Sequence, residues 1–413
     1  MASEGSLPIC AAPPLDMLYA QKMKLRPWDL KPPPGFDNVF DFVLYSRRFQ
    51  AENGYPYLPD LHRLADFFQR TTDSKKHADT IRRLYWMSNH IRYFYHPVRI
   101  CKKSGGTRQL YVPESGLKRY QRLIHQQILA ALPVCNQCAT AYVKGANLRD
   151  AALPHLGKPL VVKLDIHDFY GSIRFKTVYE RVFGEDRFPQ KVGMILANLC
   201  CCEGVLPQGA PTSPAISNIV MAPLDEAILA YCRPRGITYT RYSDDLTFSG
   251  DFDEKELIST VKELLWKDGF RLNRDKTQVI RQGQRQIVNG VVVNEKAQLP
   301  AAYRRKIRQE VYYCNKFGVR DHVIRTHQEQ FLHPNAAAED GLRVMQQQYL
   351  LHLLGQISYA LMIDPDNAEM QRYQSIMRGY LIQIRVSQRV KRFGKGGGIL
   401  HHTGLFWDDL TEL

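Results

Sequence analysis

The sequence predicts an α+β fold in which helices pack behind an antiparallel sheet, and three features support that prediction. Residues 160–164 form a short apolar run that ends at Asp165, as a buried strand would. Residues 238–241 and 246–249 are extended runs on either side of an acidic turn, which is the pattern of a β-hairpin. Apolar residues recur at helical spacing around these strands. The expected helices cover residues 176–200, 214–232 and 254–268.

The rest of the chain extends this pattern. Helical spacing predicts helices over residues 37–95 and a further helix over 117–132. Residues 98–112 read as a β-hairpin, because two extended runs flank a Ser-Gly-Gly turn with a basic tip. More strand is expected at 287–293, and helices from residue 300 to about 390.

The composition indicates an anionic partner. The chain has 413 residues, which is enough for two or three lobes with cores of their own. Its 56 Lys and Arg outnumber its 41 Asp and Glu, giving a net charge of +15. Nucleic acid is the simplest anionic partner for such a protein. The alternative is a basic protein whose charge only keeps it in solution.

The cysteines and apolar segments bear on the compartment. Cys200, Cys201 and Cys202 are consecutive, so we expect reduced, buried thiols in a cytoplasmic protein. Cys135 and Cys138 form a single CxxC without a matching second pair, which disfavours a zinc site. The N-terminus has no basic stretch before an apolar core, and its first 30 or so residues read as a loosely held leader. Apolar residues 349–363 are interrupted by polar ones and are shorter than the ~20 residues that span a bilayer, so no membrane is expected.

Three aspartates form the strongest chemical signal. Asp165 ends one predicted strand, and Asp244 with Asp245 occupies the hairpin turn that follows later in the chain. A lone aspartate after a strand, or an Asp-Asp turn, is usually only a turn or cap. Together they match what nucleotidyl transfer requires, because two divalent ions about 3.5–4 Å apart are held by a few carboxylates facing one groove. The expected cofactor is a pair of Mg²⁺ ions, with Mn²⁺ as a substitute.

Several motifs in order resemble the bacterial reverse transcriptases, most closely the retron type. Residues 206–214 read LPQGAPTSP, and 242–245 read YSDD, which is similar to the family's YxDD turn with serine where alanine is commoner. Further similar segments are KSGGTR at 103–108, LNRDKT at 272–277, VNGVVVN at 288–294, YRRK at 303–306 and YYCNKFG at 312–318. The resemblance covers roughly residues 90 to 365 and implies a right-hand polymerase.

Two segments depart from the retron pattern. Residues 151–155 read AALPH in place of NAxxH, and residues 288–290 read VNG in place of VTG. In the family these regions are associated with the choice of the structured RNA. The departures therefore concern the RNA partner, while the chemistry is expected to be intact.

The resemblance implies a role for each residue of the reaction centre. Asp165 and Asp244 would ligate both metals, and Asp245 would support the site from its edge. Tyr170 would lie under the sugar and exclude a 2′-hydroxyl, although the tyrosine could instead belong to the core. Gln208 would contact the incoming nucleotide.

The resemblance also assigns basic residues near the nucleotide. Arg108 would bind the triphosphate, since a guanidinium can pair two phosphate oxygens. Lys102 and Lys103 would add charge, or else be solvated hairpin residues. Lys276 would protonate the leaving pyrophosphate, with a surface role as the alternative. Asp168 is expected to cap or brace its turn.

Basic residues after position 300 suit a helix that lies along a template–primer duplex. Arg304, Arg305 and Arg308 would meet phosphates there, and the duplex would be read by its shape. The competing interpretation is a charged, solvated helix face. Basic residues between 378 and 395 would hold structured RNA.

The resemblance implies five regions. They are an N-terminal helical extension at 1–90, fingers at 91–158, a catalytic palm at 159–286, a thumb at 287–365 and a basic C-terminal extension at 366–413.

The implied activity is that of a retron-type RNA-directed DNA polymerase, which copies a structured noncoding RNA into single-stranded DNA (msDNA) in antiphage defence. Its partners would be that RNA and its cDNA, deoxynucleoside triphosphates, and an effector protein or toxin. Two alternatives stay open. One is another defence-associated or group II intron-like reverse transcriptase without a retron RNA. The other is a catalytically silent RNA-binding scaffold, which the clustered carboxylates disfavour.

Overall fold

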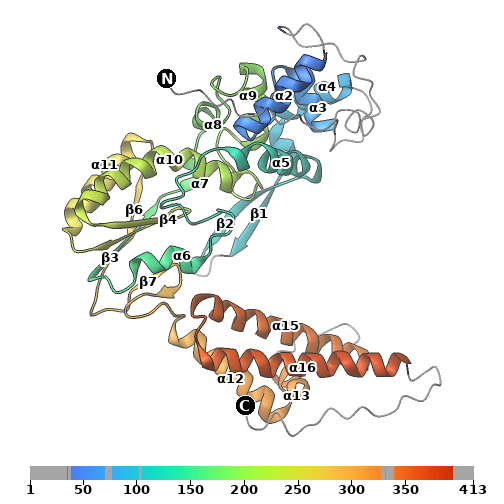
Figure 1. Ribbon diagram of the computed structural model, residues 1–413, viewed down its shortest axis with the longest axis vertical. Helices are drawn as coiled ribbons and strands as arrows, with labels where there is room; N and C mark the ends of the chain where they lie inside the picture. Colours follow the sequence, from blue (N-terminus) through green and yellow to red (C-terminus); the bar gives the residue numbers. More distant parts are fainter. Residues whose placement is uncertain are drawn as a thin grey trace, which may run out of the picture. The chain divides into compact units, whose positions relative to one another are not determined.

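The computed structural model describes residues 35, 39–69, 77–101, 105–326, 331 and 339–393 (Figure 1). The chain forms two compact units. Unit 1 comprises the described residues of Met1–Ala146 and Leu160–Val279, and unit 2 those of Asn147–Pro159 and Ile280–Leu413. The predicted leader, the tip of the hairpin at 102–104 and the chain beyond 393 lie outside the described residues.

Unit 1 is built on a four-stranded sheet. Its strands are β3 (Leu160–Ile166), β4 (Thr238–Tyr242), β5 (Asp245–Gly250) and β6 (Leu272–Arg281), in the order β4-β5-β3-β6. β5 pairs antiparallel with both of its neighbours, as a hairpin with β4 and across to β3. The predicted buried strand and acidic hairpin are confirmed. β6 was not predicted as a strand, because it lies at the sheet's edge and its half-exposed, charged sequence lacks an apolar alternation.

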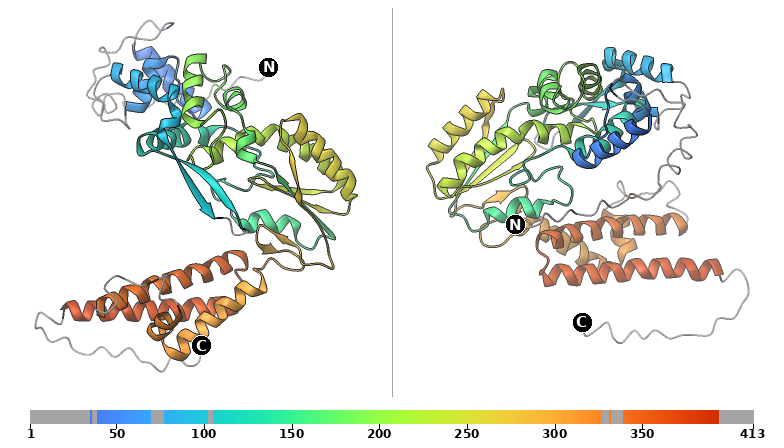
Figure 2. Two further views of the ribbon diagram at one scale, coloured as in Figure 1. Left: turned by 180° about the vertical axis from the view of Figure 1, so that it is seen from behind. Right: turned by 45° about the horizontal axis from the view of Figure 1, so that its top comes forward.

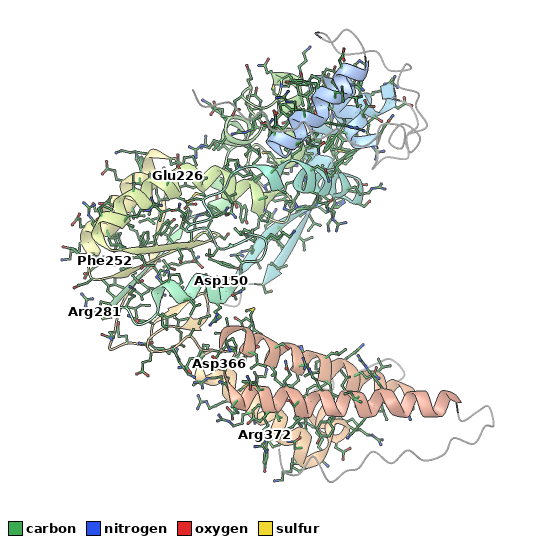
Figure 3. All side chains as sticks on the ribbon, viewed as in Figure 1. Asp150, Glu226, Phe252, Arg281, Asp366 and Arg372 are labelled. Atoms are coloured by element: carbon green, nitrogen blue, oxygen red, sulfur yellow. The ribbon has the colours of Figure 1, made fainter. Side chains whose placement is uncertain are left out.

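A long apolar helix packs behind this sheet. α10 (Ser213–Cys232) buries one side chain after another, including Ile216, Val220 and Ile228, and contacts β4 and α11 (Glu254–Lys267). Among the described helices, the segment Ser213–Arg235 passes a length-and-hydropathy test for crossing a membrane, and 56% of its apolar window is buried within the protein. That burial is typical of a core helix in a globular domain, and polar Glu226 lies exposed on the helix (Figure 3).

The single helix predicted over 176–200 is wrong, because the segment forms two helices with a break between them. α8 (Phe175–Val182) ends before Gly184, and α9 (Gln190–Cys200) begins after Pro189. Proline has no N–H to continue a helix, and it disfavours helical geometry in the residue before it. Cys200, Cys201 and Cys202 follow as buried free thiols, as predicted.

The remaining elements of unit 1 confirm the predicted N-terminal helices and the basic hairpin. The helices are α2 (Val39–Asn53), α3 (Leu61–Gln69), α4 (His77–Asn89), the short η2 (Ile91–Phe94), α5 (Ser115–Gln127) and α7 (Phe169–Ser172). The hairpin pairs β1 (Tyr95–Cys101) antiparallel with β2 (Thr107–Pro113). This ribbon is a separate sheet from the four-stranded sheet that carries the acidic turn (Figure 1).

Unit 2 is mainly helical, as the sequence predicts. Its elements are α6 (Leu148–Ala152), β7 (Ile287–Val288), β8 (Val291–Val292), α12 (Ala301–Phe317), α13 (Val319–Thr326), α15 (Glu339–Ile363) and α16 (Ala368–Phe393). The strand expected at 287–293 is only a two-residue hairpin pair. α15 and α16 lie side by side (Figure 2), and the α+β fold class is confirmed for the chain.

Candidate active site

The strand register brings the predicted aspartates together. Asp165 near the end of β3 pairs with Asp245 at the start of β5, and β4 and β5 are joined by a two-residue turn. Ser243 in that turn has φ +60°, a left-handed conformation that tight hairpin turns require. The backbone N–H of Ile166 donates to the carbonyl of Asp244 at 3.0 Å. Asp165 and Asp245, eighty residues apart in sequence, are therefore fixed at one end of the two central strands.

β6 supplies the polar partners of Asp165. Lys276 Nζ lies 2.7 Å from one carboxylate oxygen, and Asn273 Nδ2 donates to the other at 3.2 Å. Burial raises the pKa of Asp244, with the charge of Asp165 adding to the effect, and burial together with the charge of Asp244 raises the pKa of Asp245. The raised pKa values mean that the clustered carboxylate charges are unfavourable by themselves. A bound cation would offset that cost.

The donor set suits a hard divalent cation. Asp165 and Asp244 line the cleft, and Asp245 lies half-buried beside it. Within the part of the chain that the structure describes, no group of three or more His, Cys, Asp or Glu side chains is placed to hold an ion on its own. Mg²⁺ commonly takes one or two carboxylates and completes its shell with water and substrate phosphates. Two oxygen ligands at a cleft open to a phosphorylated substrate fit that chemistry.

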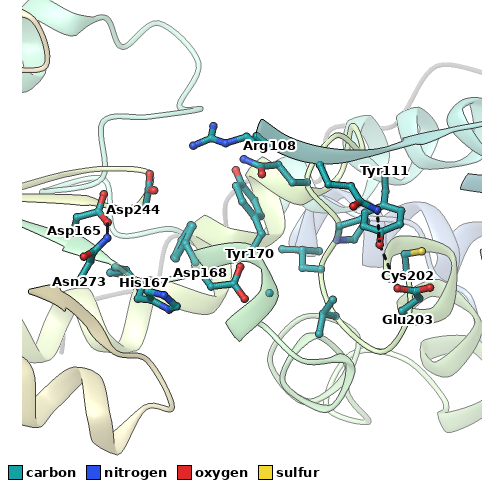
Figure 4. A pocket seen from close by; sticks show the side chains of 18 of the residues that line it. Arg108, Tyr111, Asp165, His167, Asp168, Tyr170, Cys202, Glu203, Asp244 and Asn273 are labelled. Carbon is teal, nitrogen blue, oxygen red and sulfur yellow. Dashed lines mark hydrogen bonds between the residues drawn. The ribbon is translucent and has the colours of Figure 1, made fainter. Parts of the chain in front are cut away.

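A cleft of about 520 Å³ opens beside the aspartates, within the range of small-molecule sites. It lies entirely in unit 1, between β2, the start of α7, the loop at 205–208 and the acidic turn. Figure 4 shows the side chains of Arg108, Tyr170, Asp165 and Asp244 along it. Gln208 and Lys276 also line it. Six residues selected from the sequence thus meet at one cavity.

The sequence also predicts five nucleic-acid-binding residues. Lys102 and Lys103 are outside the described residues. Arg304, Arg305 and Arg308 lie on α12 in unit 2, where Arg305 is exposed. Two of these arginines have partners within their own unit. Arg304 Nε donates to the Leu299 carbonyl at 3.2 Å, and Arg308 forms two hydrogen bonds with Glu369 at 2.7 and 3.0 Å.

Asp168 does not cap its helix, so that part of the prediction is wrong. It occupies the N-cap position of α7 with φ +43°, but its side chain accepts no cap hydrogen bond. The carboxylate instead lies over Gly171, where an added Cβ would come within 2.3 Å of it. A larger residue at 171 would therefore displace the Asp168 carboxylate, which borders the cleft.

Tyr170 is held by a chain of hydroxyl groups that the sequence did not reveal. Its hydroxyl donates to that of Tyr142 at 3.3 Å, and Tyr142 donates to Ser243 Oγ at 3.3 Å. The ring also packs edge-on against Phe169. Burial raises the pKa of Tyr170, so the phenol stays neutral. Tyr142 carries φ +61°, which is uncommon for an aromatic residue and shows that the surrounding contacts fix it.

A buried ion pair holds the acidic turn from behind. Arg241 and Asp225 are both fully buried, with Nη2 and Oδ2 2.6 Å apart, and the Tyr239 hydroxyl donates to the same carboxylate at 2.8 Å. Arg241 Nη1 also donates to Asn218 Oδ1 at 3.0 Å and to the Ser243 carbonyl at 3.2 Å. Two features of the sequence could have indicated this pair. They are a charged arginine inside a short strand and an aspartate in an otherwise apolar helix.

Comparisons with known proteins identify the family. Residues 100–314 match the family described as reverse transcriptase (RNA-dependent DNA polymerase). The chain is 33% identical over 291 residues to the retron Mx65 reverse transcriptase of Myxococcus xanthus, covering 65% of this chain and 61% of that protein. It is 28% identical over 287 residues to the retron Ec86 reverse transcriptase of Escherichia coli, covering 68% and 86%. A third relative, the retron Mx162 reverse transcriptase of Myxococcus xanthus, is 33% identical over 52% of each chain.

The chain therefore spans about three fifths of the length of the Mx65 protein and about half that of the Mx162 protein. The family match begins at the end of β1, covers β2, the acidic turn and all the residues that line the cleft, and extends into α12. The resemblance to retron enzymes seen in the sequence is confirmed, and the chain belongs to the reverse transcriptase (RNA-dependent DNA polymerase) family.

Proposed function

We propose that the protein is a retron-type RNA-directed DNA polymerase that copies a structured noncoding RNA into single-stranded DNA. The observation that carries the proposal is the pairing of Asp165 with Asp245, which brings Asp165 and Asp244 to one end of a cleft lined by Arg108 and Gln208. Its curated relatives are retron reverse transcriptases, which supports the same conclusion.

Two divalent ions, Mg²⁺ or in its place Mn²⁺, would activate the attacking hydroxyl and stabilise the leaving pyrophosphate. Asp165 and Asp244 would hold them, with Asp245 supporting the site from its edge. The strand pairing fixes the backbone of both aspartates before substrate arrives, which limits reorganisation during the reaction.

Protein side chains around the cleft would orient the nucleotide. Arg108, as a planar guanidinium, suits paired contacts with two phosphate oxygens. Gln208 is anchored through its carbonyl, which accepts from the Tyr111 backbone N–H at 2.8 Å, so its loop is tied to β2. Lys276 pairs with Asp165 here, and its 59% exposed side chain can leave that carboxylate to give a proton to pyrophosphate.

Replacing Tyr170 with alanine is expected to raise incorporation of ribonucleotides relative to deoxynucleotides by about tenfold or more. The half-buried ring borders the cleft, where it would block a 2′-hydroxyl. Tyr170→Phe is the control, because it keeps the ring and loses only the hydroxyl contact with Tyr142. Competition between the two nucleotides in primer extension measures the ratio. An unchanged ratio in an active, folded Tyr170→Ala protein would place this residue in the core alone.

Affinity for an RNA–DNA duplex is expected to fall steeply with salt, each phosphate contact adding roughly −0.7 to −0.9 to the log–log slope. Changing Arg304, Arg305 and Arg308 to glutamate should flatten that slope. Arg305 should contribute most, because Arg304 and Arg308 already have partners. Lys262→Glu on α11 is the control, since it reverses one exposed charge behind the palm sheet. A salt-insensitive wild-type affinity would rule out this thumb surface.

The chain would comprise fingers at 91–158, a palm at 159–286 and a thumb at 287–365, with extensions at 1–90 and 366–413. The enzyme would act in the cytoplasm with its noncoding RNA, its cDNA and deoxynucleoside triphosphates. An effector protein would join it in antiphage defence. The support for these parts is the retron identity of the curated relatives.

The test is to express the gene with its neighbouring DNA and analyse the nucleic acid that copurifies. We expect a short structured RNA joined covalently to single-stranded DNA. Denaturants should leave the RNA and DNA joined, and a debranching enzyme should separate them. Ordinary 3′-primed DNA would overturn the retron assignment and leave the polymerase assignment standing. Failure of the purified protein to extend any primer with Mg²⁺ would favour the silent scaffold.

A further inference from the structure

Three nearly parallel rings form an exposed stack where α4 passes into η2. The Trp86 and His90 rings have centroids 5.2 Å apart at an interplanar angle of 24°, and His90 and Tyr93 follow at 6.3 Å and 24°. Trp86 is 52% exposed and Tyr93 is 74% exposed. Large rings are usually turned toward the core, so an ordered stack with open faces is an unusual surface.

The stack is held in place by the protein beneath it. The edge of Trp86 meets the ring of Phe94 with centroids 5.2 Å apart, and His90 Nδ1 lies 2.9 Å from the Trp86 carbonyl. Met87, next to Trp86, is fully buried and ties this part of α4 to the core. Binding of a ligand that stacks on these rings would therefore cost little side-chain conformational entropy.

Three arginines lie close to the stack along the chain. Arg82 and Arg83 precede Trp86 by one helical turn and so share its face of α4, and Arg92 is adjacent to Tyr93. Arg82 approaches Asp79 only at 3.9 Å, and within the described part of the chain Arg83 makes no ion pair. Aromatic faces bordered by guanidinium groups are the combination that binds bases and phosphates of a single strand.

A chain of side-chain contacts leads from Arg92, the neighbour of Tyr93, to the wall of the cleft. Arg92 reaches Glu203 at 3.2 Å, and the Tyr111 hydroxyl donates to the same carboxylate at 3.4 Å. Tyr111 and Glu203 both line the cleft, and Tyr111 is bonded to the backbone of Gln208. The contacts of Arg92 therefore lead to the side of the cleft that β2 forms.

We propose that Trp86, His90 and Tyr93, termed the ring stack, are a docking surface for unpaired bases of the RNA template before they enter the cleft. The inference rests on the proposed function, because it needs a template strand that leads into this site. A nucleic-acid strand fits better than a protein partner, because Arg92, beside Tyr93, pairs with Glu203, which lines the cleft that a template has to reach. Stacking is tolerant of base identity, which suits a template of any sequence.

The experiment compares two labelled RNA templates annealed to the same DNA primer, one with about ten unpaired template nucleotides and one with a single unpaired nucleotide. Combining Trp86→Ala with Tyr93→Ala is expected to weaken binding of the long extension by about tenfold or more. Affinity for the short extension should stay at the wild-type value. Trp266→Ala is the matched control, since Trp266 is 63% exposed on α11 with Arg271 over its ring. It should change neither affinity.

Tryptophan fluorescence separates stacking from a merely structural role. Binding of the long extension should quench wild-type emission, and Trp86→Phe should lose most of that quenching while retaining affinity, because phenylalanine still offers a ring. Tyr93→Ala removes a largely exposed side chain, so it should fold with an unchanged melting temperature and still weaken the long extension.

Equal affinity of wild type and the double variant for the long extension would overturn the inference, as would equal loss for both templates. Loss of a copurifying protein without loss of RNA affinity would assign the ring stack to a protein partner and overturn it too. Asp244→Asn should retain the preference for the long extension. If the wild type shows that preference but extends no primer, the proposed polymerase function fails and the docking surface stands.

Discussion

Changing Asp244 to asparagine is expected to lower DNA synthesis by more than about a hundredfold while the protein stays folded and still binds RNA. The substitution keeps the shape of the side chain but removes a charge that faces the cleft. Asp244 is also a costly carboxylate, because burial and the nearby charge of Asp165 both raise its pKa. Its removal should therefore leave the free energy of unfolding unchanged or slightly higher.

Single-turnover primer extension with Mg²⁺ measures the loss, and filter binding measures the RNA affinity. Asp251→Asn is the matched control, because Asp251 is an exposed carboxylate just beyond the far end of β5. That variant should extend primers at the wild-type rate. Retention of more than a few per cent of activity by Asp244→Asn would remove Asp244 from the metal site.

Changing Arg241 to alanine is expected to lower the free energy of unfolding by about 3–5 kcal/mol, the usual cost of breaking a buried ion pair. Asp225 would be left charged in a fully buried position, with only the Tyr239 hydroxyl as a remaining donor from this network. The Ser243 carbonyl would lose its guanidinium donor as well, so the acidic turn should become mobile and DNA synthesis should fall.

Urea denaturation gives the change in stability, and primer extension gives the change in rate. Replacing both partners, as Arg241→Met with Asp225→Leu, should recover much of the stability, because no uncompensated charge remains. It should not recover the rate, since the Ser243 carbonyl still lacks its donor. Arg48→Ala is the control, because the pair of Arg48 with Glu52 is exposed to solvent. A loss of stability no larger than that of the control would show that the buried pair does not hold the turn.

Much of the candidate site could be predicted from the sequence, because short, contiguous sequence patterns specify it. A strand that ends at Asp165 and a hairpin that turns at Asp244 are specified by apolar runs a few residues long. The loop containing Gln208 was recognisable for the same reason, since its motif is contiguous. Local signals also predicted the β1–β2 hairpin, whose Arg108 side chain reaches the cleft.

Other parts of the site could not be predicted because they depend on pairing across the fold. β6 carries no apolar alternation, so its place beside β3, and with it the contact of Lys276 with Asp165, appears only once the sheet is assembled. Asp168 was expected to cap or brace its turn, whereas its carboxylate makes no cap hydrogen bond and lies over Gly171. The partner of Arg308 is likewise set by α16, far along the chain.

The sequence by itself determined the fold class, the family resemblance and the choice of the candidate aspartates, because short-range periodicity and contiguous motifs encode them. The tertiary structure decided which side chains share the cleft with those aspartates and which groups hold the acidic turn. The physical reason is that a charged side chain such as Arg241 can be buried only when a distant partner, here Asp225 on α10, compensates it. That compensation is a property of the assembled fold and leaves no local pattern in the chain.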